Sequence, residues 1–269
     1  MDLILGNMID PEDLGFKYGF SLFETFLVNS HGSVFLLQRH MERLISSMSV
    51  LGFNMGLTAE ELKSAVLRYI ENKRICNRVV RVTVSFGNKN KELSPSIYIN
   101  DLESSYQFTD YPIEFSLALS KTKKDPDSLL NYHKTGNYLG NYLEVISAAK
   151  NGYNDSLFLN YNNHITETTK CNIFFIKDGT IHTPSVQCGL LPGIVRSWVI
   201  ETFKESNLGV IEGAYTIEDV NNAQEVFLTN SVAGIAVVRR IDNKIINMGS
   251  QGDLTLKVFE KYNSSMKME

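Results

Sequence analysis

The sequence predicts a mixed α and β protein built from two domains. Some segments carry apolar residues at helical spacing, whereas β-branched residues dominate residues 78–86. Residues 121–127 form a charged, proline-containing stretch without periodicity, as is typical of a junction. We therefore place a smaller N-terminal α/β domain at residues 1–115 and a larger C-terminal domain at residues 116–269.

The N-terminal domain is predicted to combine helices with short strands. Apolar residues at helical spacing predict an amphipathic helix at Arg39–Ser47. Thr58 and Glu61 form a capping-box pattern, which predicts that a second helix begins behind Thr58. Runs typical of extended chain predict strands at Ser33–Leu37, Arg78–Phe86 and Ile97–Asn100.

The C-terminal domain is predicted to contain strands and helices as well. A helix is expected to begin just after Lys134, with apolar residues along one face, and to end at Gly152. Asp178-Gly179 is a strong signal for a two-residue hairpin turn. Pro192-Gly193 precedes an amphipathic run and so predicts a helix start. Strands are expected at Ser156–Asn160, Ile173–Ile176, Thr180–Thr183 and Glu225–Leu228.

Composition argues against several classes of function. The net charge of -4 and the pI near 5.8 provide no basic surface for nucleic acid. No apolar run is long enough to cross a membrane, and the N-terminus lacks the pattern of a signal peptide. The three cysteines are odd in number and irregularly spaced, and the histidines show no metal-ligand spacing. We expect a cytoplasmic protein without a metal ion, a nucleic-acid partner or a membrane partner.

Lys134 is the first candidate for chemistry. It lies in the polar and aromatic run Asn131–Tyr138, at a loop-to-helix junction. A lysine becomes a useful nucleophile only where burial or a nearby cation disfavours its ammonium form. This setting could do so, although local sequence alone favours an ordinary surface lysine.

An anion site is the second candidate. Gly189–Arg196 brings a glycine-bearing turn into a helix start, where free N–H groups and the helix dipole favour an anion. Thr229 and Arg43 could add a hydroxyl and a bidentate guanidinium to the same anion, and Glu167 could pair with a buried cation. Each feature also has a plainer interpretation: an ordinary helix start, a turn, a solvated arginine and a strand-edge acid.

In their order along the chain, these segments resemble the successive motifs of aminotransferase class IV, the fold-type IV family of pyridoxal-phosphate (PLP) enzymes. The resemblance covers about the whole chain. It implies a two-domain α/β (α+β) architecture like that of D-amino-acid aminotransferases, with pyridoxal 5'-phosphate as the cofactor. The motifs that carry it are Tyr18–Thr25, His40–Leu44, Lys134–Leu139, Thr166–Phe174 and Leu191–Arg196.

The resemblance also implies roles for individual residues. Lys134 would hold PLP as a Schiff base and later move the proton at the substrate carbon. Glu167 would pair with the pyridine nitrogen and keep the ring protonated as an electron sink, and Tyr138 would approach the ring's phenolic oxygen. The other cofactor-binding residues implied are Arg43, Thr229 and the backbone N–H groups of Ile194 and Val195 at the phosphate, and Asn172 near the cofactor.

Subgroup resemblances favour 4-amino-4-deoxychorismate lyase, which releases pyruvate and forms 4-aminobenzoate for folate synthesis. They are the compact length, the Lys134–Leu139 segment, and the hydroxyl-rich segments around Glu167 and Thr229. The alternative is a branched-chain or D-amino-acid aminotransferase of the same fold. A third hypothesis is a catalytically silent binding protein, which would be expected to have lost the lysine, the glutamate or the phosphate contacts.

The substrate pocket is where the sequence departs from the family pattern. Family members commonly read Asp-Gly where this chain has Phe20-Ser21, a change that adds an aromatic group and removes a charge. Thr25 is the residue that we expect to assist the lyase step. The resemblance further implies a small-molecule amine substrate and a homodimer whose partner contributes to the active site.

Overall fold

The structure, a computed structural model, describes residues 9–53, 56–88, 95–106, 110–204, 208–246 and 253–268. The chain divides into two compact units. The first comprises the chain up to Ser105 together with His133–Tyr138, and the second comprises Tyr106–Tyr132 together with Leu139–Met268. The boundary differs from the predicted one after residue 115, which falls inside the second unit.

Lys134 groups with the first unit, not with the C-terminal domain that was expected to carry it. The reason is backbone pairing. Thr135 forms an antiparallel bridge with Leu22, and the N–H of Phe23 donates to the carbonyl of Lys134 at 2.9 Å. A short segment from the middle of the chain is thereby added to the edge of an N-terminal strand.

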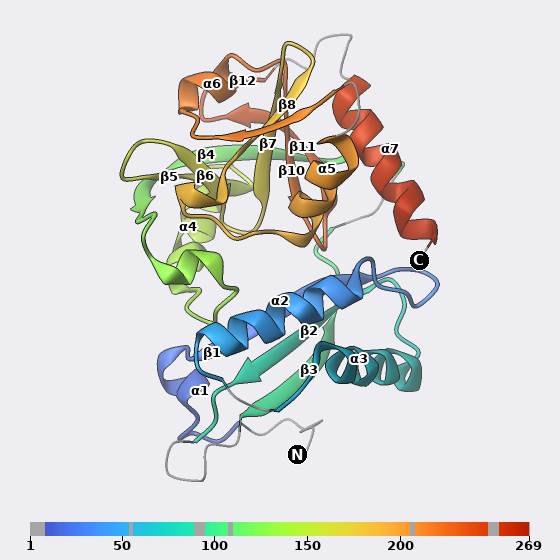
Figure 1. Ribbon diagram of the computed structural model, residues 1–269. Helices are drawn as coiled ribbons and strands as arrows, with labels where there is room; N and C mark the ends of the chain where they lie inside the picture. The colour runs from blue at the N-terminus through green and yellow to red at the C-terminus, as the bar shows by residue number, and fades with distance from the viewer. Residues whose placement is uncertain are drawn as a thin grey trace. The chain divides into compact units, whose positions relative to one another are not determined.

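The first unit packs two helices, α2 and α3, against a three-stranded antiparallel sheet of order β1-β2-β3 (Figure 1). Leu22, Phe26 and Val28 of β1 point toward these helices and join their apolar residues in one core. The alternate residues of β1 project from the opposite face of the sheet. The elements are α1 (Leu14–Tyr18), β1 (Ser21–Val28), α2 (Leu37–Val50), α3 (Ala59–Lys73), β2 (Arg78–Ser85) and β3 (Ser96–Leu102).

Most sequence predictions for this unit are confirmed, including the Thr58–Glu61 capping box at the start of α3. The strand expected at Ser33–Leu37 is wrong. Only Val34 forms a bridge, to Val28, and α2 already begins at Leu37. β1, which pairs with β2 and carries part of the core of this unit, was not predicted from the sequence.

The second unit is built on one sheet of nine strands within the described residues. Strands β4, β5, β6, β7, β10 and β11 pair in a closed circuit, because β10 pairs with β7 as well as with β11. The helices are α4 (Leu139–Lys150), α5 (Ile194–Lys204), α6 (Ile217–Asn221) and α7 (Asp253–Met268), with 3-10 turns at Leu129–Tyr132 and Val186–Cys188. The strands are β4 (Ile113–Lys124), β5 (Asp155–Asn160), β6 (Ile165–Thr168), β7 (Asn172–Lys177), β8 (Thr180–Pro184), β9 (Val210–Gly213), β10 (Glu225–Asn230), β11 (Gly234–Ile241) and β12 (Lys244–Ile245).

The hairpin predicted at Asp178-Gly179 is confirmed, since both residues have positive φ and join β7 to β8. The helix expected just after Lys134 begins only at Leu139. Ala148 is the buried residue of this helix, whereas its apolar side chains at Leu139 and Leu143 are exposed. None of the helices in the described ranges combines the length and apolar character that crossing a membrane requires.

Candidate active site

Lys134 lies against an aromatic side chain of β1. Its Nζ is 4.6 Å from the centre of the Phe23 ring, and the guanidinium carbon of Arg81 is 3.6 Å from the same ring centre. Tyr138 meets that ring edge-on, with 5.8 Å between the ring centroids. The first unit therefore gathers two cations and the Tyr138 ring around the ring of Phe23.

Thr25 shares the sheet face of this cluster. It follows Phe23 by two positions in β1 and stands directly opposite Arg81 in β2, so all three side chains project to the same side. The Thr25 hydroxyl is buried and has no hydrogen-bond partner. Burial lowers the pKa of Arg81, and no carboxylate of the described residues lies within ion-pair distance of it. A hydroxyl and a cation are thus available here to a ligand.

Arg43 binds Glu24 on the face of the sheet opposite to Phe23 and Thr25. Its Nε and Nη2 each donate to one oxygen of Glu24 at 2.7 Å, and Nδ1 of His40 donates to the same carboxylate at 2.7 Å. Burial would raise the pKa of Glu24, but Arg43 and His40 outweigh it and lower that pKa to about 2. Glu24 is therefore ionised near neutral pH and fixes the orientation of Arg43.

Glu167 is held from several sides within the second unit. Nζ of Lys124 lies 2.5 Å from its Oε1, while the amide of Asn172 and the N–H of Leu191 each donate to its Oε2 at 3.2 Å. The Asn172 amide also donates to the carbonyl of Leu191 at 2.9 Å. These bonds fix a largely buried carboxylate and tie it to the turn that precedes α5.

The predicted anion site comprises Thr229 and the start of α5. Thr229 pairs with Asn172 across β10 and β7, and Asn172 pairs with Glu167 across β7 and β6, so the three follow one another across the sheet. The Thr229 hydroxyl is buried without a hydrogen-bond partner. Gly193 needs to lack a side chain, because a Cβ there would collide with Oδ1 of Asn172. Ile194 and Val195 are the first residues of α5, whose N–H groups have no carbonyl one turn earlier in the helix.

Phe20 does not enter this chemistry. Its ring packs on Phe53 and Phe86, with ring centroids 5.0 and 4.5 Å away, next to the core of the first unit. Of the two residues at which this chain departs from the family pattern, Phe20 is therefore a packing residue, whereas Ser21 lies on the sheet face of Phe23 and Thr25.

Sequence reasoning missed two charged residues. Arg81 could have been noticed as a charged residue within a β-branched run, but nothing local indicated that it would lie on the ring that Lys134 contacts. Lys124 lies in the stretch that was interpreted as a junction, and the structure makes it the last residue of β4. Lys124 and Glu167 are 43 positions apart in the sequence, so no local pattern indicates their contact.

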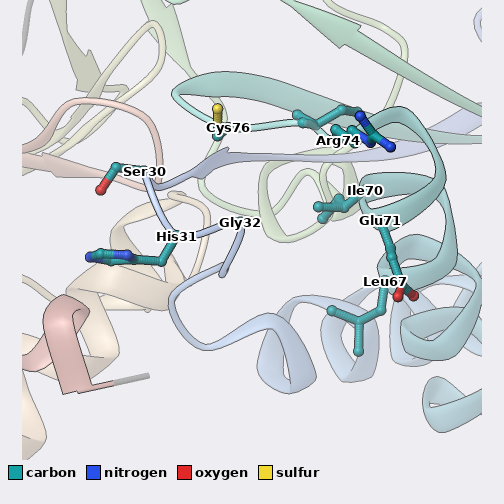
Figure 2. Close-up of a pocket in the computed structure, with 9 residues that line it drawn as sticks. Ser30, His31, Gly32, Leu67, Ile70, Glu71, Arg74 and Cys76 are labelled. Carbon is teal, nitrogen blue, oxygen red and sulfur yellow. The ribbon is translucent and has the colours of Figure 1, made fainter.

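A separate hollow of about 440 Å³ lies in the first unit, between the turn after β1 and the end of α3 (Figure 2). It contains none of the predicted site residues, and its cysteine, Cys76, is exposed and free. Its lining residues are Ser30, His31, Gly32, Leu67, Ile70, Glu71, Arg74, Ile75 and Cys76.

Comparison with known proteins decides the family. The model of the amino-transferase class IV family matches residues 21–241. This chain belongs to that family. Class IV enzymes depend on PLP, so the predicted enzyme class, cofactor and fold class are confirmed.

The relatives of this class IV chain include proteins named as aminotransferases and proteins named as lyases. A putative branched-chain-amino-acid aminotransferase of Methanocaldococcus jannaschii is 30% identical over 96% of this chain and 93% of its own length. Aminodeoxychorismate lyase of Bacillus subtilis is 28% identical over 97% of this chain and 90% of its own. A solved structure of a putative 4-amino-4-deoxychorismate lyase from Legionella pneumophila has a TM-score of 0.88 at 27% identity and covers 97% of both chains.

The residues present fit a phosphorylated pyridine cofactor. The orphaned hydroxyl of Thr229 and the open start of α5 suit a phosphate, and Glu167 offers a fixed carboxylate to a protonated ring nitrogen. Asn172 links these two features through its bonds to Glu167 and to the turn before α5. A row of residues within the second unit thus offers groups that suit both the phosphate and the ring nitrogen.

Proposed function

We propose that this class IV enzyme is a PLP-dependent 4-amino-4-deoxychorismate lyase, which forms 4-aminobenzoate for folate synthesis and releases pyruvate. The observation that carries the proposal is the buried, unpartnered hydroxyl of Thr25, on the same face as Phe23 and Arg81. A lyase acting on this substrate must assist the departure of an oxygen leaving group, and a hydroxyl donor suits that task. Arg81 suits the carboxylates that the substrate bears.

The cofactor is proposed to be held as follows. Lys134 binds it covalently, Glu167 pairs with its ring nitrogen, and Tyr138 approaches its phenolic oxygen. Bound PLP supplies an electron sink for the carbon that carries the substrate amine. The other proposed contacts are Arg43, Thr229 and the N–H groups of Ile194 and Val195 at the phosphate, and Asn172 near the ring.

In the proposed reaction the substrate amine would take the place of Lys134 on the cofactor, and the amine of Lys134 thus freed acts as the base. Its Nζ takes the proton from the ring carbon that carries the amine, and the bond from the adjacent carbon to the enolpyruvyl oxygen breaks. Thr25 Oγ1 donates a hydrogen bond to that departing oxygen, and the proton removed by Lys134 is returned to the leaving group, which becomes pyruvate. One substrate molecule thereby yields 4-aminobenzoate and pyruvate with no further reactant, and aromatisation drives the step.

A branched-chain or D-amino-acid aminotransferase is the second candidate, favoured by the relative that is named as a branched-chain aminotransferase. In that reaction Lys134 would move a proton from the α-carbon of an amino acid, and Arg81 would bind the carboxylate. Thr25 would then have no leaving group to assist. The two candidates therefore differ in what they require of Thr25.

The test is an assay of the PLP-loaded protein with enzymatically generated aminodeoxychorismate, run beside amino acids with 2-oxoglutarate. We expect equal amounts of 4-aminobenzoate and pyruvate and little amino transfer. Thr25→Val should lower lyase turnover by about 10²-fold because the hydrogen bond to the leaving oxygen is lost, whereas Thr25→Ser should retain most of it. Amino transfer without 4-aminobenzoate, or full lyase turnover in Thr25→Val, would count against the proposal.

We also propose that two copies of the chain associate through an apolar stripe on α4. Leu139, Tyr142, Leu143 and Ile146 recur at helical spacing, and Leu139 and Leu143 are 71% and 56% exposed. The nearby Leu129 and Leu130 are exposed as well. An exposed apolar stripe of this kind is typical of an interface, and a second copy of the chain is the occupant that the family resemblance implies.

Leu143→Glu should convert the proposed dimer into a monomer, because a buried unpaired carboxylate would face the partner. Sedimentation should then give a species of one chain, 30.4 kDa, instead of two. Leu67→Glu is the matched control, because Leu67 is an exposed leucine of α3. An unchanged dimer in Leu143→Glu, or a monomeric wild type, would refute the α4 interface.

A further inference from the structure

Lys124 is the charged residue that faces Glu167. Both side chains are largely buried, at 13% and 11% exposure, and their Nζ and Oε1 atoms lie 2.5 Å apart. Lys124 also lies over the Phe158 ring, 5.1 Å from its centre. Its neighbour Lys123 is exposed and instead donates to Asn163 at 2.6 Å. The two lysines thus differ in surroundings although they are adjacent in β4.

The remaining groups that face the Glu167 carboxylate are neutral. The amide of Asn172 on β7 and the N–H of Leu191 in the turn before α5 both donate to Oε2. Within the described residues, Lys124 of β4 is the charged group in ion-pair distance of this carboxylate. Since the pair is shielded from solvent, salt screens its interaction only weakly.

We propose that Lys124 is a positioning residue that fixes Glu167 through Oε1 and, through its positive charge, weakens the hold of this site on the proton of the PLP ring nitrogen. The inference rests on the proposed role of Glu167 as the ring-nitrogen partner. A nearby positive charge disfavours a second one, and Lys124 also offsets part of the negative charge that would attract a protonated ring nitrogen. Lys124 therefore sets how tightly the ring nitrogen keeps its proton, and with it the strength of the electron sink.

The test uses the holoenzyme loaded with PLP that carries ¹⁵N in the pyridine ring. The ¹⁵N chemical shift is followed against pH, which reports protonation of that nitrogen without any turnover. Lys124→Gln, which keeps a hydrogen-bond donor but loses the charge, should raise the titration midpoint by about one pH unit. Lys124→Met is measured alongside it, so that the result does not depend on one variant folding. Lys124→Arg and the adjacent control Lys123→Gln should match the wild type.

Equal midpoints in Lys124→Gln, Lys124→Met and the wild type would overturn the inference. An equal rise in Lys123→Gln would overturn it too, because the effect would then come from net charge and not from the contact with Glu167. Glu167→Gln tests the underlying role separately and should leave the ring nitrogen unprotonated over most of the range. If Glu167→Gln leaves the midpoint unchanged, the proposed role of Glu167 fails whatever the lysine variants show.

Discussion

Lys134→Ala should abolish turnover, with a loss of about 10⁴-fold or more, because the same amine is proposed to bind the cofactor and to move the proton. The variant should keep its fold, since the backbone of this segment is held by the Leu22–Thr135 bridge and by the bond from Phe23 to the Lys134 carbonyl. Reduction of the loaded wild type with borohydride, followed by peptide mass analysis, should place the cofactor on Lys134.

Lys123→Ala is the control for this experiment, because Lys123 is an exposed lysine whose loss should change neither turnover nor labelling. Small primary amines added to Lys134→Ala should restore part of the activity, since they can supply the missing base. Cofactor found on another lysine of the wild type, or near-normal turnover in Lys134→Ala, would remove Lys134 from the mechanism.

Glu167→Gln should reduce turnover by about 10²- to 10³-fold while the protein still binds PLP. An amide cannot stabilise a protonated ring nitrogen as a carboxylate does, and the ring becomes a weaker electron sink. The substitution also leaves Lys124 buried without its partner, which is expected to cost about 3 kcal/mol of folding free energy. Both turnover and the free energy of unfolding must therefore be measured.

The double variant Glu167→Gln with Lys124→Met separates these two effects. Removing the orphaned ammonium should recover most of the lost stability, because no unpaired charge is then buried. Turnover should remain low, since the ring nitrogen still lacks its carboxylate. Recovery of turnover together with stability would show that Glu167 acts only through the fold.

Local patterns predicted most of the helices and the turn between β7 and β8, because these signals lie within a few residues of each other. The Thr58–Glu61 capping box and the Asp178-Gly179 turn are examples, and each depends on backbone hydrogen bonds or φ angles of its own segment. β1 was missed because its strand character comes from pairing with β2 along its whole length, which no local pattern displays. Its residues Phe23 and Thr25 consequently gained their neighbours only in the folded chain.

The sequence by itself determined the family, the cofactor and the motif residues for which roles are proposed, because these are carried by motifs in a fixed order, whereas Arg81 and Lys124 lie outside those motifs. Only the tertiary structure decided which groups surround those residues. Arg81 and Lys134 both contact the ring of Phe23, and Lys124 forms an ion pair with Glu167. Each of these contacts joins segments that are distant in sequence. Such contacts follow from strand register and burial, which are properties of the folded chain.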